Sequence, residues 1–485
     1  MLFTSLEFLF AFLPIVLVVN FLLPAKARNY WLLVMSLLFY AWGEPKFVLV
    51  MLGSIVVNYF MALCIAKISV PPEPCSAKKH AQFWRRLLLC ITVAANLSVL
   101  FLCKYMNFTT SNLVALFPSL AGSLKITSFV LPIGISFFTF QALSYVIDVY
   151  RGIPVQKNIA YVGLYISLFP QLIAGPIVRY TTVAEEIKHR SVTFESFSKG
   201  VMRFLYGFNK KMLLANILAK AADAAFASTN LSVGLSWVGI VCYTLQIFFD
   251  FAGYSEMAIG LGQMLGFKFL ENFDYPYISK TVTEFWRRWH ISLGSWFRDY
   301  LYFPLGGSRV KTRSRLIFNL AVVWLATGIW HGANWTFILW GVMYGVIIIF
   351  EKLLDLPKRL PNFKVASIAY QIFTLLAVMI GWVLFRSESL GGALHYLKTM
   401  FGLSGAPLLD AAAIFNLREY ILPLIVGILC STPIFPMIRE KASKKSVAFF
   451  NVYELLSGLG QIILFLVGIS YLVINGHNPF IYFNF

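Results

Sequence analysis

The sequence contains few charged residues. Only 13% of its 485 residues are Asp, Glu, Lys or Arg, whereas 59% are apolar, and the mean hydropathy is +0.75. Soluble domains carry roughly 25% charged residues, so this composition excludes an ordinary soluble protein and indicates that lipid surrounds most of the chain. There is also no internal repeat, no low-complexity segment and no long polar stretch. We therefore predict one membrane domain over residues 1–485.

Cysteine and acidic residues are also scarce. The six cysteines show no CxxC pair and no metal-ligand spacing, which predicts neither a structural disulfide nor a metal cluster. They are Cys64, Cys75, Cys90, Cys103, Cys242 and Cys430. Lys and Arg number 40 against 21 Asp and Glu, a net charge of +19. Because the cations stand in short loops between apolar runs, we interpret them as topological and not as a nucleic-acid-binding surface. Binding of an anionic ligand at the cytoplasmic face is the lesser alternative.

Charge-free runs long enough to span a bilayer recur along the sequence, and they do not alternate as barrel strands do. They are Phe47–Ala66, Leu87–Cys103, Ile126–Ile147, Asn158–Val178, Val365–Phe385 and Tyr420–Ile438, with longer runs at Leu316–Phe350 and Leu455–Phe485. The expected fold is an all-α polytopic membrane helix bundle of roughly 11–14 embedded helices, some too short to cross fully.

The beginning of the sequence does not resemble a cleavable signal peptide. Lys and Arg are absent before Lys26, so Met1–Pro24 is expected to remain as the first helix. Alternating the first spans places the basic loop Lys67–Arg86, with its Pro-rich turn at Val70–Pro74, inside and Asn107–Ser123 outside.

One segment, Thr283–Gly307, is too charged and too aromatic for an ordinary membrane span. Its aromatic residues recur three or four apart and predict one helical face, with Thr283 as a cap and Pro304 near the end. Spacing alone favours an amphipathic helix at the membrane interface. The functional alternative is a mouth for a phosphate-bearing donor, bordered by three arginines. These are Arg287, Arg288 and Arg298.

A histidine, His331, stands near the middle of the Leu316–Phe350 run. A titratable side chain at that depth needs partners or a purpose. Gly328, Gly332 and Gly341 would let another backbone or a substrate approach. From the residues alone, a neutral histidine hydrogen-bonded inside a bundle is as good an interpretation as a functional one. No cysteine or nucleophile elbow accompanies it, so a general base acting on a hydroxyl fits better than a covalent intermediate.

A further apolar stretch, Gln246–Met264, contains two acidic residues. We expect Asp250 and Glu256 to pair with arginines or helix ends, which is a structural role. Glycines in the same stretch, such as Gly253, permit close helix packing.

Three motifs resemble the membrane-bound O-acyltransferase family, and within it the alginate O-acetyltransferase branch. They are FDFAGYSEMAIG at Phe249–Gly260, FWRRWHISLGSWFRDYLYFPLGG at Phe285–Gly307 and GIWHGANWTFILWG at Gly328–Gly341. The opening MLFTSLEFLFAFLPIVL and the ending NPFIYFNF are also similar, so the resemblance spans the full length. The departure is small: Gly294 stands where Ser is more usual.

The resemblance implies helices around a central funnel or tunnel, with His331 and His290 as the catalytic residues. His290 is expected to orient the thioester or polarise its carbonyl. The same motifs supply candidates for structural or tunnel-lining roles. These are Asp250, Tyr254, Trp330 and Asn334.

The resemblance also implies the substrates and partners. Acetyl-coenzyme A or another acyl thioester is the expected cytoplasmic donor, an extracellular or cell-wall polysaccharide resembling alginate is the acceptor, and no cofactor or metal is permanently bound. The expected partners are an extracytoplasmic SGNH-hydrolase-like acetyltransferase and membrane lipid, and the expected location is the bacterial inner membrane.

Other functions remain compatible with the motifs. D-alanyl transfer to teichoic acid uses the same histidines with a carrier-protein donor, and peptidoglycan or cellulose O-acetylation fits equally well. A transporter or flippase without chemistry would predict two pseudo-symmetric halves with broken helices. The sequence instead has one region rich in His, Arg and Trp.

Overall fold

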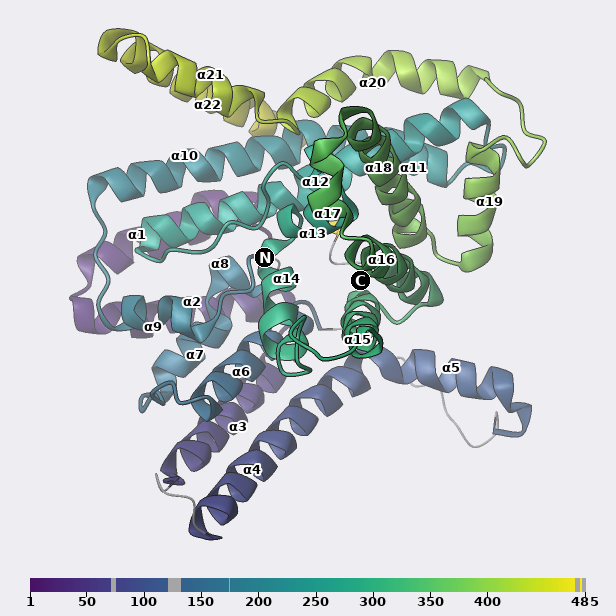
Figure 1. The fold of residues 1–485 in the computed structure, drawn as a ribbon. Coiled ribbons are helices and arrows are strands. Elements are labelled where there is room, and N and C mark those ends of the chain that lie inside the picture. The colour runs from purple at the N-terminus through teal and green to yellow at the C-terminus, as the bar shows by residue number, and fades with distance from the viewer. Residues whose placement is uncertain (71–75, 121–131, 174, 476–479, 482–485) are drawn as a thin grey trace. The chain divides into compact units, whose positions relative to one another are not determined.

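The structure is a computed structural model that describes residues 1–70, 76–120, 132–173, 175–475 and 480–481 (Figure 1). Cys75, most of the Val70–Pro74 turn, the first part of Ile126–Ile147 and most of the NPFIYFNF ending lie outside the described residues. Within them, every regular element is a helix. The prediction of an all-α protein is confirmed.

The chain forms two compact units. The first unit is Met1–Val201 with Ala258–Leu270, and the second is Met202–Met257 with Glu271–Phe485. Two helices, α10 (Phe194–Lys210) and α12 (Val233–Leu265), supply residues to both units. Whether the whole chain acts as one membrane domain stays a prediction.

The first unit contains the helices from the N-terminus to α9. They are η1 (Phe8–Phe12), α1 (Leu13–Leu22), α2 (Ala25–Gly43), α3 (Val48–Lys67), α4 (Ser76–Leu100), η2 (Phe101–Tyr105), α5 (Met106–Leu116), η3 (Pro118–Leu120), α6 (Ile135–Tyr150), α7 (Ile159–Ser167), α8 (Phe169–Leu172) and α9 (Tyr180–Lys188). Helices α3, α4 and α6 pack against one another. Asn58 on α3 and Asn96 on α4 exchange amide hydrogen bonds of 3.0 and 2.9 Å, which satisfies both buried side chains.

The second unit contains the remaining helices. They are η4 (Lys211–Ala215), α11 (Asn216–Phe226), η5 (Pro276–Ile278), α13 (Val282–Arg288), α14 (Ile291–Phe297), η6 (Arg298–Tyr302), α15 (Arg313–His331), α16 (Trp335–Leu353), α17 (Leu356–Arg359), η7 (Leu360–Asn362), α18 (Lys364–Arg386), α19 (Leu390–Met400), α20 (Ala411–Cys430), α21 (Ile434–Ser443) and α22 (Val447–Asn475).

Seven helices among the described residues are long and apolar enough to cross a membrane. They are Val48–Lys67, Ser76–Leu116, Val233–Leu265, Trp335–Leu353, Lys364–Arg386, Ala411–Cys430 and Val447–Ile474. Shorter apolar helices occupy Phe8–Leu22 and Ile135–Tyr150. These helices confirm a multi-pass membrane protein. The number of embedded helices and the central tunnel stay predictions.

Three of the apolar runs are each divided between two helices. Asn158–Val178 divides into α7 and α8, because Leu168 leaves the helical conformation (φ −53°, ψ 113°) and Pro170 has no N–H to continue a helix. Leu316–Phe350 divides into α15 and α16 at the extended Gly332. The run Tyr420–Ile438 belongs to α20 and α21, which separate before Pro433.

The segment Asn107–Ser123, which is expected outside the membrane, is helical over residues 107–116, and its side of the membrane stays a prediction. Helix α5 continues α4 through the π-helical turn η2 and ends at Leu116. Between Asn107 and Leu116 there is no glycine or proline, so nothing in the sequence stops the helix before Pro118.

Helices α15 and α16 form an antiparallel hairpin in the second unit (Figure 1). A Cβ added at Gly328 would lie 2.6 Å from the carbonyl oxygen of Phe337, and one at Gly341 would lie 2.6 Å from that of Trp324. Neither position has room for a side chain. The predicted close approach of another backbone is confirmed for these two glycines, and it brings His331 to the closed end of the hairpin.

Candidate active site

His290 lies at a turn between α13 and α14. Its backbone is left-handed, with φ 47° and ψ 53°, and Trp289 before it is extended. A non-glycine residue in this conformation interrupts a helix. The single amphipathic helix predicted over Thr283–Gly307 is therefore wrong: the segment contains two short helices and the π-helical turn η6.

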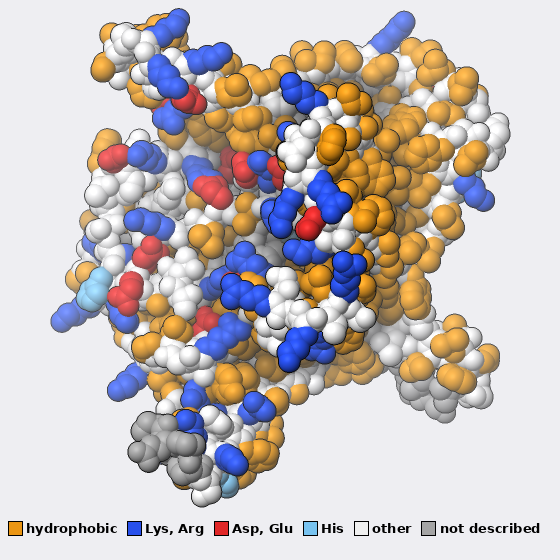
Figure 2. Space-filling view, in the orientation of Figure 1, with side chains coloured by type: hydrophobic (Ala, Val, Ile, Leu, Met, Phe, Trp, Pro, Cys, Tyr) orange, Lys and Arg blue, Asp and Glu red, His pale blue; other side chains and the backbone are white. Residues whose placement is uncertain are grey.

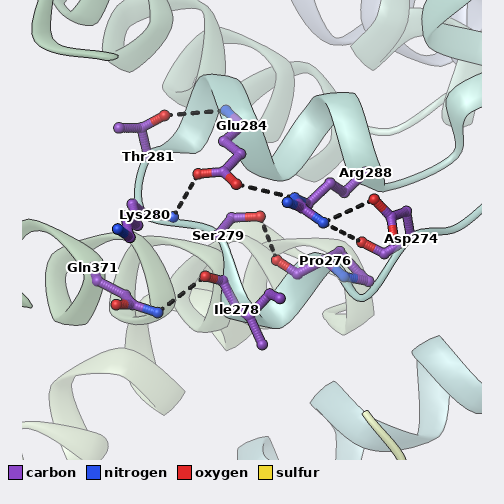
Figure 3. A network of polar contacts seen from close by, with 9 residues as sticks. All are labelled: Asp274, Pro276, Ile278, Ser279, Lys280, Thr281, Glu284, Arg288 and Gln371. Atoms are coloured by element: carbon purple, nitrogen blue, oxygen red, sulfur yellow. Dashed lines mark hydrogen bonds and ion pairs between the residues drawn. The ribbon is translucent and has the colours of Figure 1, made fainter. Parts of the chain in front are cut away.

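The start of α13 is held by groups from two elements. The Thr281 side chain accepts a hydrogen bond of 3.1 Å from the backbone N–H of Glu284 (Figure 3). Thr281, and not the predicted Thr283, is thus the N-cap. The N–H groups of Val282 and Thr283 instead donate to the two carboxylate oxygens of Glu351, each at 2.7 Å. Sequence reasoning missed Glu351, although it is the first charged residue after a long charge-free run.

The segment from α13 to η6 begins and ends beside the open end of the α15–α16 hairpin, where α15 begins and α16 ends. Its start contacts Glu351 in the last turn of α16. Its end is held by Arg315 and Asn319 near the start of α15, which donate to the carbonyl oxygens of Leu305 (3.2 Å) and Gly307 (3.0 Å). His290, at the turn, lies against Trp330 one residue before the closed end. The segment is therefore re-entrant within the second unit, with His290 at its tip.

The His290 imidazole is almost completely buried, with 1% of the residue exposed. Its Nδ1 lies 3.1 Å from Oδ1 of Asn272. The ring of Phe251 contacts it edge-on, with centroids 4.7 Å apart, and the Trp330 ring lies at 6.2 Å. Burial lowers the pKa of His290 to about 3, because the charged form would lose its hydration. The ring is neutral at physiological pH.

His331 is the last residue of α15 and is also buried. Its ring contacts Trp330, Trp340 and Phe385, with centroid distances of 4.9, 4.8 and 5.2 Å. Trp330 therefore contacts both histidines. The structure brings the two predicted catalytic residues into one aromatic cluster.

The other predicted residues of these motifs have structural contacts. Asp250 forms an ion pair with Lys211, and its Oδ2 accepts a hydrogen bond of 2.8 Å from the N–H of Ile481. Glu256 pairs with Lys210 at 2.6 Å. The expected arginine partners are wrong. Two consecutive lysines, placed where α10 passes into η4, hold the two acids of α12.

Tyr254 and Asn334 also have defined positions. The Tyr254 ring stacks on Phe480, with centroids 4.7 Å apart. Asn334 caps α16 by accepting from the N–H of Thr336 at 3.1 Å, and it donates to the carbonyl oxygen of Glu388 at 2.8 Å. Asn334 thus fixes the turn that follows His331.

The three arginines predicted to border a donor mouth differ in their contacts. Arg288 contacts the carboxylates of Glu284 (3.0 Å) and Asp274 (2.8 Å), as Figure 3 shows. Arg298 pairs with Asp299 at 2.9 Å, and Arg287 is exposed. Their role in donor binding stays a prediction.

A basic cluster that the sequence reasoning did not assign to the site precedes and begins α15. Its members are all exposed and lie at the open end of the hairpin. They are Arg309, Lys311, Arg313 and Arg315. Figure 2 shows Lys and Arg side chains gathered over the area where Figure 1 places α13 to α17.

This arrangement supplies two buried imidazoles, aromatic walls and a basic approach. It suits proton transfer from a hydroxyl in a water-poor environment. Among the described residues, no three His, Cys, Asp or Glu side chains come together as metal ligands.

Residues 78–390 match the model of the membrane-bound O-acyltransferase family. Because the match covers more than half of the sequence, the chain belongs to this family, and it is an O-acyltransferase. It is 38% identical over 516 residues to a protein of Azotobacter vinelandii named "Probable alginate O-acetylase AlgI", covering all of both chains. It is 43% identical over 406 residues to the protein of the same name in Pseudomonas aeruginosa (83% of this chain, 75% of the relative). It is also 32% identical over 532 residues to a "Peptidoglycan O-acetyltransferase" of Helicobacter pylori (100% of this chain, 98% of the relative).

Proposed function

We propose that this O-acyltransferase moves an acetyl group from a cytoplasmic thioester, acetyl-coenzyme A or a related donor, toward the hydroxyls of an extracytoplasmic polysaccharide resembling alginate. The names of the relatives support the acetyl group and the polymer. The observation that carries the proposal is the pair of buried imidazoles, His290 and His331, which both lie against Trp330. The relatives are bacterial, which supports a place in the bacterial inner membrane.

The distribution of charge supports the direction of transfer. The open end of the α15–α16 hairpin carries Arg313 and Arg315 at one helix start and Lys352 at the other helix end, whereas residues 316–350 contain no Lys or Arg. The positive-inside rule assigns such an end to the cytoplasm. His331 lies 18 residues along α15 from Arg313, which is about 27 Å at 1.5 Å per residue. A donor entering at the basic end would meet the acceptor near the far end of the hairpin.

The proposed step is a single acyl transfer. His331 accepts the proton of the acceptor hydroxyl as its oxygen attacks the thioester carbonyl carbon. The carbon–sulfur bond then breaks, and the proton passes to the leaving thiolate, which gives an ester and a free thiol. His290 orients the thioester. A positioned general base contributes about a hundred- to ten-thousandfold in rate.

Purified protein in proteoliposomes tests the proposal, with radiolabelled acetyl-coenzyme A on the side of the basic end and alginate oligosaccharide on the other. We expect His331→Ala to reduce labelled ester by at least a hundredfold. His395→Ala is the matched control, since His395 is exposed on α19. Transfer by His331→Ala at the rate of the wild type would eliminate the mechanism. Flux of label without ester would instead indicate a transporter.

A second acceptor is favoured by one observation. The Helicobacter pylori relative matches the entire chain and is named for peptidoglycan. Muropeptides offered beside alginate oligosaccharide distinguish the two polymers. We propose in addition that an extracytoplasmic SGNH-hydrolase-like partner completes the transfer. A higher yield of acetylated polymer when both proteins are reconstituted together than with this protein alone would support this partner.

A further inference from the structure

Asn272 makes several contacts with the His290 turn. Its backbone carbonyl accepts from the N–H of Ile291 at 2.9 Å. Its side-chain Oδ1 accepts from the backbone N–H of Ser292 at 3.1 Å and from the Ser292 hydroxyl at 2.9 Å. The same Oδ1 lies 3.1 Å from Nδ1 of His290. All three side chains are about 1% exposed.

The orientation of the Asn272 amide follows from these contacts. A backbone N–H can only donate, so the atom facing Ser292 N–H must be the acceptor oxygen. Turning the amide over would place its NH₂ group against that N–H. No described residue accepts a hydrogen bond from Nδ2 of Asn272, so the oxygen alone fixes the side chain.

The proton of the imidazole can then be located. An unprotonated Nδ1 at 3.1 Å from Oδ1 would set two lone pairs against each other, whereas Nδ1–H makes an ordinary hydrogen bond. The Ser292 hydroxyl lies farther from Nδ1, at 3.4 Å, and already donates to Asn272. A neutral ring with its proton on Nδ1 has a lone pair on Nε2.

We propose that Asn272 is a positioning residue that holds His290 in the Nδ1–H tautomer, so that Nε2 accepts a hydrogen bond from an N–H or O–H group of a substrate. This inference rests on the proposed function. It also changes the expected role of His290: a ring nitrogen that accepts cannot polarise the thioester carbonyl by donating to it. The group that donates this hydrogen bond to Nε2 is either an amide N–H of the thioester donor or a second hydroxyl of the acceptor.

A purely structural role for Asn272 is the competing explanation, because the residue also satisfies two N–H groups at the start of α14. The two roles differ in one property. A structural cap needs an oxygen for Ser292 but is indifferent to the side of the ring that carries the proton. The tautomer of His290 in the Asn272 variants, compared with their acetyl transfer, therefore discriminates between them.

Solid-state ¹⁵N spectra of the full chain in proteoliposomes, labelled at histidine, provide this measurement. The spectrum of His290→Asn identifies the signals of His290 among the six histidines. We expect the wild type to show a protonated Nδ1 and an unprotonated Nε2. Asn272→Asp keeps an acceptor oxygen and should keep this tautomer, whereas Asn272→Leu, of similar size, should lose it. Ser292→Ala removes only the hydroxyl and is the matched control.

Acetyl transfer by the same variants gives the second readout. Loss of a group that orients a functional imidazole typically costs on the order of ten- to a hundredfold, which we expect for Asn272→Leu. Asn272→Asp should recover most of this loss, and Ser292→Ala should stay within about threefold of the wild type. A KM that rises for acetyl-coenzyme A identifies the donor as the group held by Nε2. A KM that rises for the oligosaccharide identifies the acceptor.

Two results would overturn the inference: a wild-type spectrum with the proton on Nε2, or Asn272→Leu working as fast as the wild type. If Asn272→Leu does not fold, the wild-type spectrum and the Asn272→Asp variant still test the inference. Failure of the proposed function is distinguishable, since it would appear as full transfer by His331→Ala whatever the tautomer of His290.

Discussion

Glu351→Gln replaces one of the two oxygens that hold the start of α13. In the wild type, Glu351 is fully buried and accepts from the N–H groups of Val282 and Thr283 and from the Tyr370 hydroxyl. The substitution turns an NH₂ group toward one of these donors. A buried N–H left without an acceptor costs about 1–3 kcal/mol. Loss of a negative charge at a helix N-terminus adds roughly 0.3–2 kcal/mol.

We therefore expect Glu351→Gln to lower the free energy of unfolding by about 1–5 kcal/mol, the sum of those two ranges. Because α13 ends two residues before His290, acetyl transfer should fall as well. Tyr370→Phe is the matched control: it removes one donor to Glu351 and leaves both backbone contacts, so a loss of about 0.5–1.5 kcal/mol is expected.

Unfolding by SDS in mixed micelles, followed by circular dichroism, measures both variants against the wild type. Transfer of labelled acetyl groups in proteoliposomes measures the effect on the site. The reasoning would be refuted if Glu351→Gln unfolded within about 0.5 kcal/mol of the wild type and kept its activity, since ±0.5 kcal/mol is the usual effect of a substitution away from any such contact.

Three further predictions concern packing, the buried ion pair and pH. Gly328→Leu should lower the free energy of unfolding by at least about 1–3 kcal/mol, because its Cβ would meet a backbone oxygen. A Cβ at Gly460 would meet nothing within 4 Å, so Gly460→Leu should leave the same SDS titration unchanged. Lys211→Met should lower the free energy of unfolding by about 3–5 kcal/mol, because it leaves the Asp250 charge buried without its partner. The double variant Lys211→Met/Asp250→Leu should lose less, and equal losses in the two variants would contradict a coupled pair. For His290 the folded pKa of about 3 lies below the unfolded value of about 6.5, so below pH 6.5 only the unfolded chain binds the proton. Stability should fall by about 1.4 kcal/mol per pH unit from 6.5 toward 3 and be unaffected above 6.5; His290→Asn should lack this dependence in unfolding measured at pH 5 and 7.5.

The membrane class could be read from the sequence because it depends on local composition, whereas the resemblance to the family singled out His331 and His290 as catalytic. A span must be apolar along its whole length, and a histidine inside one is visible at once. The helix breaks were harder. A single left-handed residue at His290 divides an otherwise regular aromatic pattern, and no glycine or proline marks the place.

The supporting residues could not be predicted for a different reason. Asn272 is 18 residues from His290, and Glu351 is 69 residues from Val282. Both are ordinary polar residues until the fold places them against a helix start. The partners of Asp250 show the same limit, since the sign of the partner was predictable and its identity as Lys211 was not.

The left-handed backbone at His290 also restricts how this enzyme can change over evolutionary time. Besides histidine, glycine, asparagine and aspartate tolerate that conformation best, whereas branched or bulky residues would strain the turn and the helices on both sides. A related protein that lost the chemistry of His290 would keep the fold of this turn most easily with asparagine at the same position. Gene families that drift from this ancestor should therefore exchange histidine for asparagine at the tip more often than for alanine or leucine.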